Sequence, residues 1–397
     1  MTKKTDARAA QNAIAQALGQ HVSYQHRASS AVVNAVNKRL HELAGVLAIE
    51  LQPLLDGLTP AEMRLFLSGQ YRTNRLKKLR DAIKEFGDES GAALAQEWEV
   101  SAPKLAAYEV GYTAAMMDKV VEGMPRIKAT GDAAYKRAMA VPLAGSPPYG
   151  GKLVQELLDG FGGANADRVM TSLRAGIASG QSNSQLIKSI RGTKALNYQD
   201  GIVQIARGDA ERFIRTARSH VSNQAMTDVY EQLGVVEVID VATLDGRTSK
   251  HCASIDGRRH KVGTNHPRPP YHPNCRTVQA PALDGDLIGT RPYVRALKVR
   301  GRDGESSFRS IGDMTKRQRE RAGLSVGQVQ ASTNYSGWFG NQDAEFQRQW
   351  LGKTRYRLYT EGKYSLDRFV DPLSGKQYTL DELRMRDNET FRQIFGD

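Results

Sequence analysis

The sequence is poor in cysteine and aromatic residues, and it lacks long apolar runs. Its 397 residues include only two cysteines, Cys252 and Cys275, which excludes a framework of several disulfides. No run approaches the ~18 uncharged apolar residues that a membrane-spanning helix needs. Residues 1–18 also lack the compact apolar stretch of a secretory signal. We therefore expect a soluble, multi-domain protein of a reducing compartment, with no membrane contact.

Positive charge is what the chain has in excess. It carries 56 Lys and Arg against 43 Asp and Glu, a formal net charge of +13, which favours nucleic acid or another acidic surface as a partner. The segment from Arg291 to Arg321 alone holds ten basic and four acidic residues. It predicts a surface that binds DNA or a protein partner, although a solvated face or flexible arm has the same composition. The candidate binding residues are Arg300, Arg302, Lys316, Arg317, Arg319 and Arg321.

The pattern along the chain predicts an α+β fold that is mostly α. We expect a helical N-terminal region over residues 1–145, ended by the Pro- and Gly-rich stretch 141–150. A helical domain bearing a small β unit with a Cys/His/Pro-rich loop should follow over 150–282. A basic, irregular segment over 283–335 and a helical C-terminal segment over 336–397 complete the predicted organisation.

Local signals predict several element boundaries. Thr59–Glu62 and Ser182–Gln185 have the spacing of capping boxes, which begin helices. Residues 235–244 and 275–280 are rich in β-branched residues and predict strands. Asp256–Gly257 predicts a hairpin turn between two further short strands.

Residues 245–281 are the strongest candidate for a functional site, because they contain both cysteines and four of the eight histidines. Thiolates and imidazoles are the ligands that zinc prefers, in a tetrahedron of four. His272 and Cys275 have the spacing of a chelating pair, whereas the neighbours His251 and Cys252 would point to opposite faces of a strand. The candidate zinc ligands are Cys252, His272, Cys275 and His251, with His260 as an alternative to His251.

The same composition has other interpretations. The cysteines can be small buried apolar residues, or a disulfide, and the loop can be a proline-braced turn that fixes two strands. Cys252 with His272 and either Asp245 or Asp256 can be drawn as a catalytic triad, but nothing in the sequence brings these residues together. The alternative function is a zinc-dependent nuclease or other hydrolase. Its centre would be formed by His266, His272 and Cys275.

Three separated blocks of sequence form one ordered pattern. The central block consists of Asp245–Thr248, Cys252–Gly257 and Pro269–Arg276. Phe213–Arg218 precedes it and Phe346–Arg355 follows it. In this order the blocks resemble the signature of the phage Mu F-like head morphogenesis family, the minor head proteins of tailed bacteriophages and prophages.

The resemblance implies a structural protein and no enzyme. It implies head morphogenesis and DNA packaging or delivery, with the portal protein and major capsid or scaffold proteins as partners. It also implies assembly in the host bacterial cytoplasm and a final place in the virion, inside the capsid near the portal vertex. Sequence-independent contact with double-stranded DNA fits the basic charge, although an adaptor of the portal without a DNA function fits the resemblance too.

The sequence departs from the family at the candidate metal site. Members often carry two further cysteines, at positions that Ser249 and Thr277 occupy here. Either His251 and His272 replace them as ligands, or the fold is held by packing without a metal. Zinc is therefore the one cofactor to test, and no cofactor is firmly expected.

Overall fold

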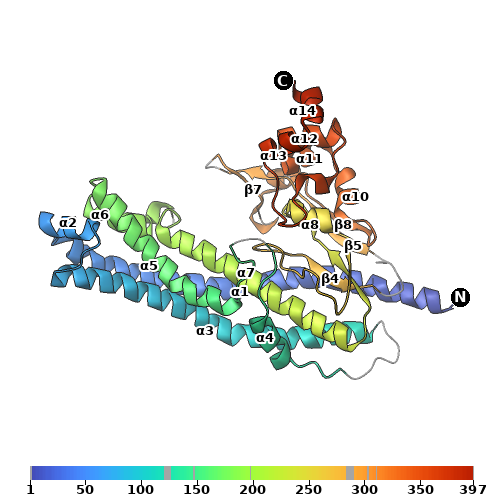
Figure 1. Cartoon of the computed structure of the whole chain (residues 1–397), viewed down its shortest axis with the longest axis horizontal. Helices are drawn as coiled ribbons and strands as arrows, with labels where there is room; N and C mark the ends of the chain where they lie inside the picture. Colours follow the sequence, from blue (N-terminus) through green and yellow to red (C-terminus); the bar gives the residue numbers. More distant parts are fainter. Residues whose placement is uncertain are drawn as a thin grey trace.

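A long helical rod and a smaller unit that stands on it make up the molecule (Figure 1). The smaller unit contains the elements from residue 237 onward and is called the C-terminal unit. The computed structural model confirms the predicted α+β class with mostly α structure. It describes residues 2–119, 127–145, 148–196, 198–282, 290–301, 304–309 and 311–396.

The two longest helices of the rod, Thr2–Asp56 and Asn74–Asp118, run antiparallel along its length, and the helices that follow pack along them (Figure 1). Leu40, Leu94, Leu173 and Val221 come from four of these helices and are all fully buried in one apolar core. The elements of the rod are α1 (Thr2–Asp56), α2 (Pro60–Leu67), α3 (Asn74–Asp118), α4 (Gly131–Ala140), α5 (Val154–Ala178), α6 (Asn183–Arg191), η1 (Lys194–Leu196) and α7 (Ile202–Gln232).

The predicted capping boxes begin helices where the sequence placed them. Thr59 accepts a hydrogen bond from the backbone of Glu62, and Glu62 accepts one in return from the backbone of Thr59 at the start of α2. Ser182 and Gln185 make the same pair at the start of α6. Each pair satisfies two backbone N–H groups that a helix end otherwise leaves unpaired.

The break at residues 141–150 interrupts the helices but does not divide the core. Helices α5 and α7 pack against α1 and α3 in the same apolar cluster, so the predicted regions 1–145 and 150–282 share one helical body. Gly87 of α3 and Gly162 of α5 show how close this contact is: a Cβ on Gly162 would lie 2.5 Å from the carbonyl oxygen of Gly87. Side chains there would force the two helices apart.

Two small three-stranded sheets follow α7. The first has the order β3-β1-β4 and is antiparallel. The second has the order β2-β5-β8. Strand β4 of the first sheet and strand β5 of the second contact α1, which attaches the β region to the rod. The strands are β1 (Glu237–Val241), β2 (Leu244–Asp245), β3 (Arg259–Lys261), β4 (Val278–Pro281), β5 (Thr290–Arg295), β6 (Val299–Arg300), β7 (Ser306–Ser307) and β8 (Ser325–Gln330).

The predicted hairpin at Asp256–Gly257 is wrong in its first strand. Residues Lys250–Ile255 form a short helix, α8, because the Ser249 side chain caps it by accepting from the backbone of Cys252. Gly257 does turn the chain with a φ of +91° and leads into β3. The side chain of Asp256 is buried and ion-paired with Arg291, at 2.8 Å.

The segment 283–335, predicted to be irregular, contains regular structure in its described part. β5 and β8 pair over six residues, from Thr290 opposite Gln330 to Arg295 opposite Ser325. The two strands lie far apart in the sequence, so local composition carried no sign of their pairing.

The C-terminal segment is helical, as predicted, and packs around an aromatic core. Tyr335, Trp338, Phe339, Phe346 and Trp350 are buried and in mutual ring contact. No helix within the described ranges combines the length and apolar character needed to cross a membrane. The elements are η2 (Ile311–Asp313), α9 (Lys316–Arg321), α10 (Tyr335–Gly340), α11 (Ala344–Leu351), α12 (Lys353–Thr360), η3 (Leu366–Phe369), α13 (Leu380–Arg386) and α14 (Asn388–Phe395).

Candidate metal centre and basic helix

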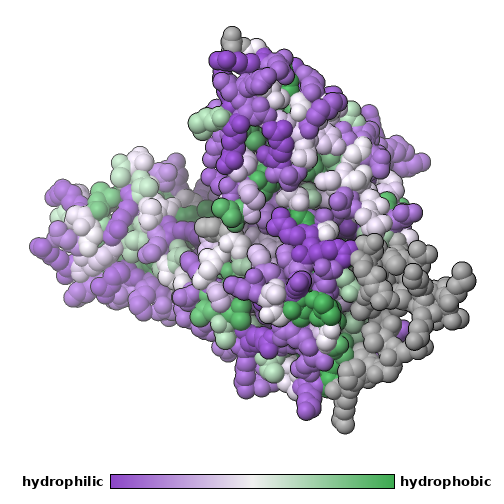
Figure 2. Space-filling view, turned by 45° about the vertical axis from the view of Figure 1, so that its right-hand side comes forward, coloured by the Kyte–Doolittle hydropathy of each residue, from purple (hydrophilic) through white to green (hydrophobic). Residues whose placement is uncertain are grey.

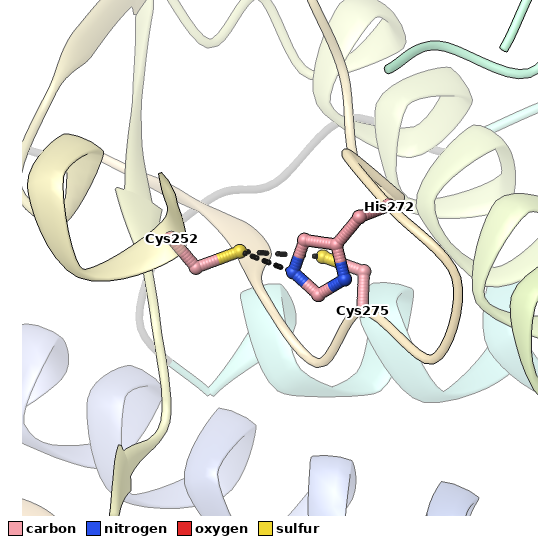
Figure 3. Close-up of side chains that lie close together, drawn as sticks. All are labelled: Cys252, His272 and Cys275. Carbon is pink, nitrogen blue, oxygen red and sulfur yellow. Dashed lines mark hydrogen bonds between the residues drawn. The ribbon is translucent and has the colours of Figure 1, made fainter. Parts of the chain in front are cut away.

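Three predicted ligands meet where α8 approaches the loop before β4 (Figure 3). Cys252 lies in the first turn of α8, held there by the Ser249 cap. His272 and Cys275 lie on one tight turn, in which the backbone N–H of Cys275 donates to the carbonyl of His272 at 3.1 Å. The donor atoms of the three side chains all lie within 4.8 Å of one another.

The spacing of the two sulfurs fits a shared metal ion. Their Sγ atoms are 3.7 Å apart, and two thiolates at ~2.3 Å from a tetrahedral zinc would be separated by about 3.8 Å. The Sγ of Cys252 lies 3.0 Å from Nε2 of His272, which is about 0.5 Å closer than two ligands of one zinc would sit. The cluster therefore accommodates zinc after a small outward movement of the imidazole.

The imidazole of His272 is oriented for ligation by Nε2. Its Nδ1 lies 2.9 Å from the carbonyl oxygen of Pro273, to which an N–H at Nδ1 donates. Nε2 then faces Cys252 and the hydroxyl of Ser249, which is 2.8 Å away. A backbone carbonyl on the other ring nitrogen is the usual way in which proteins fix a metal-ligating histidine.

The pKa values of the two thiols in the cluster are shifted in opposite directions. Burial, and then the neighbouring Cys275, raise the pKa of Cys252 well above that of a free thiol. Burial also opposes the ionisation of Cys275, but hydrogen bonds from Cys252 and His272 hold its pKa well below the usual value. The pKa of His272 is raised: burial disfavours its charge, but the interaction with Cys275 outweighs that effect. Cys275 is thus the thiol of the pair that ionises more readily, and thiolate is the form that binds zinc.

The other histidines of the segment lie outside this cluster. His251 is on α8 next to Cys252, yet its ring packs edge-on against Tyr271, at 5.5 Å between centroids. His260 and His266 stack on each other at 4.7 Å, and His260 also lies 2.8 Å from the buried carboxylate of Asp240. Among the described residues the ligand group consists of Cys252, His272 and Cys275.

The carboxylates of the hypothetical triad are bound to arginines. Asp245 makes a two-pronged ion pair with Arg276, at 2.6 and 2.7 Å. Asp256 is paired with Arg291 inside the protein. The ring nitrogens of His272 are bonded to Ser249, Cys252 and Pro273, and to neither carboxylate. The described side chains therefore do not form this triad.

The two thiols are shielded from solvent. Cys252 is 2% exposed and Cys275 is 4% exposed. The cavity that borders Cys275 has a volume of about 50 Å³, which is far below the ~300 Å³ at which sites for small molecules begin. This arrangement suits a structural centre better than a nucleophile that must reach a substrate.

The predicted binding residues form an exposed basic helix. Lys316, Arg317, Arg319 and Arg321 lie on α9, no residue of which is buried. The helix begins with a capping box between Thr315 and Gln318. Among the described residues none of these four cations is ion-paired. Arg300 is also exposed, in β6, whereas Arg302 lies outside the described residues.

Sequence reasoning missed a second set of cations close to the cluster. Arg247, Lys250 and Lys298 line a pocket of about 600 Å³ that His272 borders. Arg247 belongs to the block that carries the family resemblance, but Lys298 is about 50 positions away. Only the folded chain shows that they share a pocket.

His26 of α1 lies beside this region and keeps its ring neutral. Burial is the main reason that its pKa falls to about 4, and the arginines Arg215, Arg276 and Arg247 lower it further, against a small opposite effect of Glu211. Arg215 approaches the ring to 2.6 Å.

We expect His26 to destabilise the fold in acid. In the unfolded chain its pKa returns to about 6.5, so only the unfolded state takes up this proton between pH 6.5 and 4, and the free energy of unfolding falls as the pH drops through that range. His26→Gln should remove about 1–2 kcal/mol of this loss, after allowance for the exposed part of the ring. Urea unfolding at pH 7 and pH 4.5 measures it. An equal pH effect in both proteins would contradict the assignment.

The family model described as Phage Mu protein F like protein matches residues 167–280. No curated protein and no solved structure gives a match. The matched range runs from α5 through α7 and the first sheet and includes Cys252, His272 and Cys275, whereas the C-terminal block at Phe346–Arg355 lies beyond it. The match over residues 167–280 therefore confirms the resemblance to the phage Mu F-like proteins. It suggests that the chain is a phage head morphogenesis protein located in the virion.

Proposed function

We propose that this chain is a minor head protein that acts at the portal vertex and contacts packaged DNA without sequence preference. The observation that supports it is α9, a solvent-exposed helix whose four cations have no ion-pair partner among the described residues, on a chain that matches the Mu F-like family model over residues 167–280. DNA carries one negative charge per ~1.7 Å of duplex axis, so such a helix binds it through phosphates alone. On the face shown in Figure 2, hydrophilic side chains cover most of the C-terminal unit, which carries α9.

The helical rod is the proposed surface for the portal and for major capsid or scaffold proteins. It extends well beyond the base of the C-terminal unit, so a long stretch of it stays free (Figure 1). Val46 and Ile49 of α1 are exposed apolar side chains on this stretch, 53% and 75% accessible. They lie three residues apart, and therefore on one face of the helix.

Binding of the purified protein to duplex DNA tests the DNA part of the proposal. Two duplexes of equal length and unrelated sequence should bind with equal affinity, because phosphate contacts carry no sequence information. The logarithm of the association constant should fall with the logarithm of the salt concentration, with a slope of about −3 to −4 if all four cations meet phosphates. A salt-independent affinity, or a strong preference for one sequence, would contradict the proposal.

A structural zinc ion at Cys252, His272 and Cys275 is the second part of the proposal. The match of the sulfur spacing to a zinc tetrahedron supports it. The ion would tie α8 to the loop before β4. Three ligands would leave one position of the tetrahedron to another group; the hydroxyl of Ser249 lies 2.8 Å from Nε2 of His272.

The same observations favour a protein without catalytic activity over the zinc-dependent hydrolase. The thiols are buried, and His266 packs against His260 at a distance from the cluster. Supercoiled plasmid should therefore stay intact when it is incubated with the protein and zinc or magnesium. Nicking that a chelator abolishes, and that His272→Ala removes, would establish the hydrolase instead.

A further inference from the structure

The pocket of about 600 Å³ in the C-terminal unit has the features of a binding site. It opens between the start of α8, the stretch before β6, and α11. Its charged lining consists of Arg247, Lys250 and Lys298, and no carboxylate is among the described residues that line it. Its volume lies within the ~300–1,000 Å³ typical of sites for small molecules.

The three cations line one pocket, and no carboxylate is among its described lining residues. The guanidinium of Arg247 lies 5.7 Å from the ring centre of Phe308, and the ammonium of Lys298 lies 5.6 Å from the same ring. Both cations thus lie beside one aromatic side chain at the wall of the pocket. Among the described residues, the ion pairs include neither of them.

Lys250 is the third cation that lines the pocket. Its ammonium donates to the backbone carbonyl of Trp350 at 2.6 Å and lies 4.1 Å from the centre of the Trp350 ring. Asp245 does not line the pocket, and its carboxylate is bound by both prongs of Arg276 and by the backbone N–H of Arg247. The pocket therefore keeps three positive charges that no side chain of the described chain neutralises.

Like charges that converge in a recess repel one another, and an anion between them removes that cost. An arginine fork and two ammonium groups are the donors that proteins use for phosphate, with bidentate geometry from arginine and point charges from lysine. We propose that this pocket binds a phosphate group, held by Arg247, Lys250 and Lys298. The phosphate belongs either to a free nucleotide or to the end of a DNA strand, because the pocket is too small to admit a duplex.

The site is separate from α9, whose residues do not line the pocket. Its test can therefore fail while the proposed function stands. Arg247 and Lys298 are both exposed, so their replacement by glutamine should leave the fold intact, which an unchanged melting temperature verifies.

Titration calorimetry on the full chain tests the proposal. The probes are inorganic phosphate, deoxyadenosine monophosphate, and a short single strand with or without a 5′-phosphate. We expect saturable binding of one ligand per chain to at least one phosphate probe. The double variant R247Q/K298Q should bind it at least about ten-fold more weakly, since charge-assisted hydrogen bonds are lost.

A matched control removes the same charge elsewhere. The variant K104Q/K194Q, whose lysines are exposed and line neither the pocket nor α9, should bind each phosphate probe as the unmodified protein does. Tight binding of the mononucleotide identifies a free nucleotide as the ligand, and a preference for the 5′-phosphorylated strand identifies a DNA end. Absence of saturable binding to every probe, or equal binding by R247Q/K298Q, would overturn the proposal.

Discussion

Replacing Lys316, Arg317, Arg319 and Arg321 by glutamine should lower the affinity for duplex DNA by about 100- to 1,000-fold near physiological salt. Each lost phosphate contact removes the release of about one counterion, so the salt slope should flatten by about 3 to 4. The helix itself should persist, because none of its side chains is buried and its capping box is untouched. Fluorescence anisotropy over a range of salt concentrations measures both quantities.

The control for this variant removes four charges from scattered positions. Lys104, Lys119, Lys128 and Lys194 are exposed and lie apart from α9. Their replacement by glutamine changes the net charge equally, and should reduce the affinity much less. Equal losses in the two variants would show that net charge, and not α9, determines binding.

Removal of zinc should have the second large effect. If zinc is present at 1,000 times its dissociation constant, it stabilises the native state by about 4 kcal/mol. A chelator should lower the melting temperature of the unmodified protein accordingly. The variant C252S/C275S should melt lower already and show no further change with chelator. Elemental analysis should find about one zinc per chain in the unmodified protein.

His251→Gln is the matched control for the metal, since His251 borders the cluster but packs against Tyr271. It should retain zinc and the response to the chelator. If the unmodified protein contains no metal and a chelator leaves its melting temperature unchanged, the zinc proposal fails. The hydrogen bonds among Cys252, His272 and Ser249 would then hold α8 against the loop before β4 without a metal.

The helical part of the fold was predictable because its signals are local. Capping boxes at Thr59 and Ser182 act within four residues, and the apolar face of α7 recurs at helical spacing. The packing of α5 against α3 was not predictable, since it depends on Gly87 and Gly162 meeting across helices. For that reason the break at 141–150 was interpreted as a domain boundary, although the core continues across it.

The candidate site was predictable in its chemistry but not in its geometry. The clustering of cysteine and histidine indicated a candidate metal site, and Cys252, His272 and Cys275 do meet. Sequence alone did not separate His251 from them, because that depends on α8 being a helix capped by Ser249. The cationic pocket left no sequence signal, because Arg247 and Lys298 are about 50 positions apart and line it together only in the folded chain.

The central claim is that this chain is a component of the phage head. The most direct measurement is to locate it in purified particles, by cryo-electron microscopy with a label on the chain and by quantifying its copies per particle. The account predicts a few copies at one vertex, inside the capsid next to the portal. Particles that assemble and package DNA without containing the chain would contradict it.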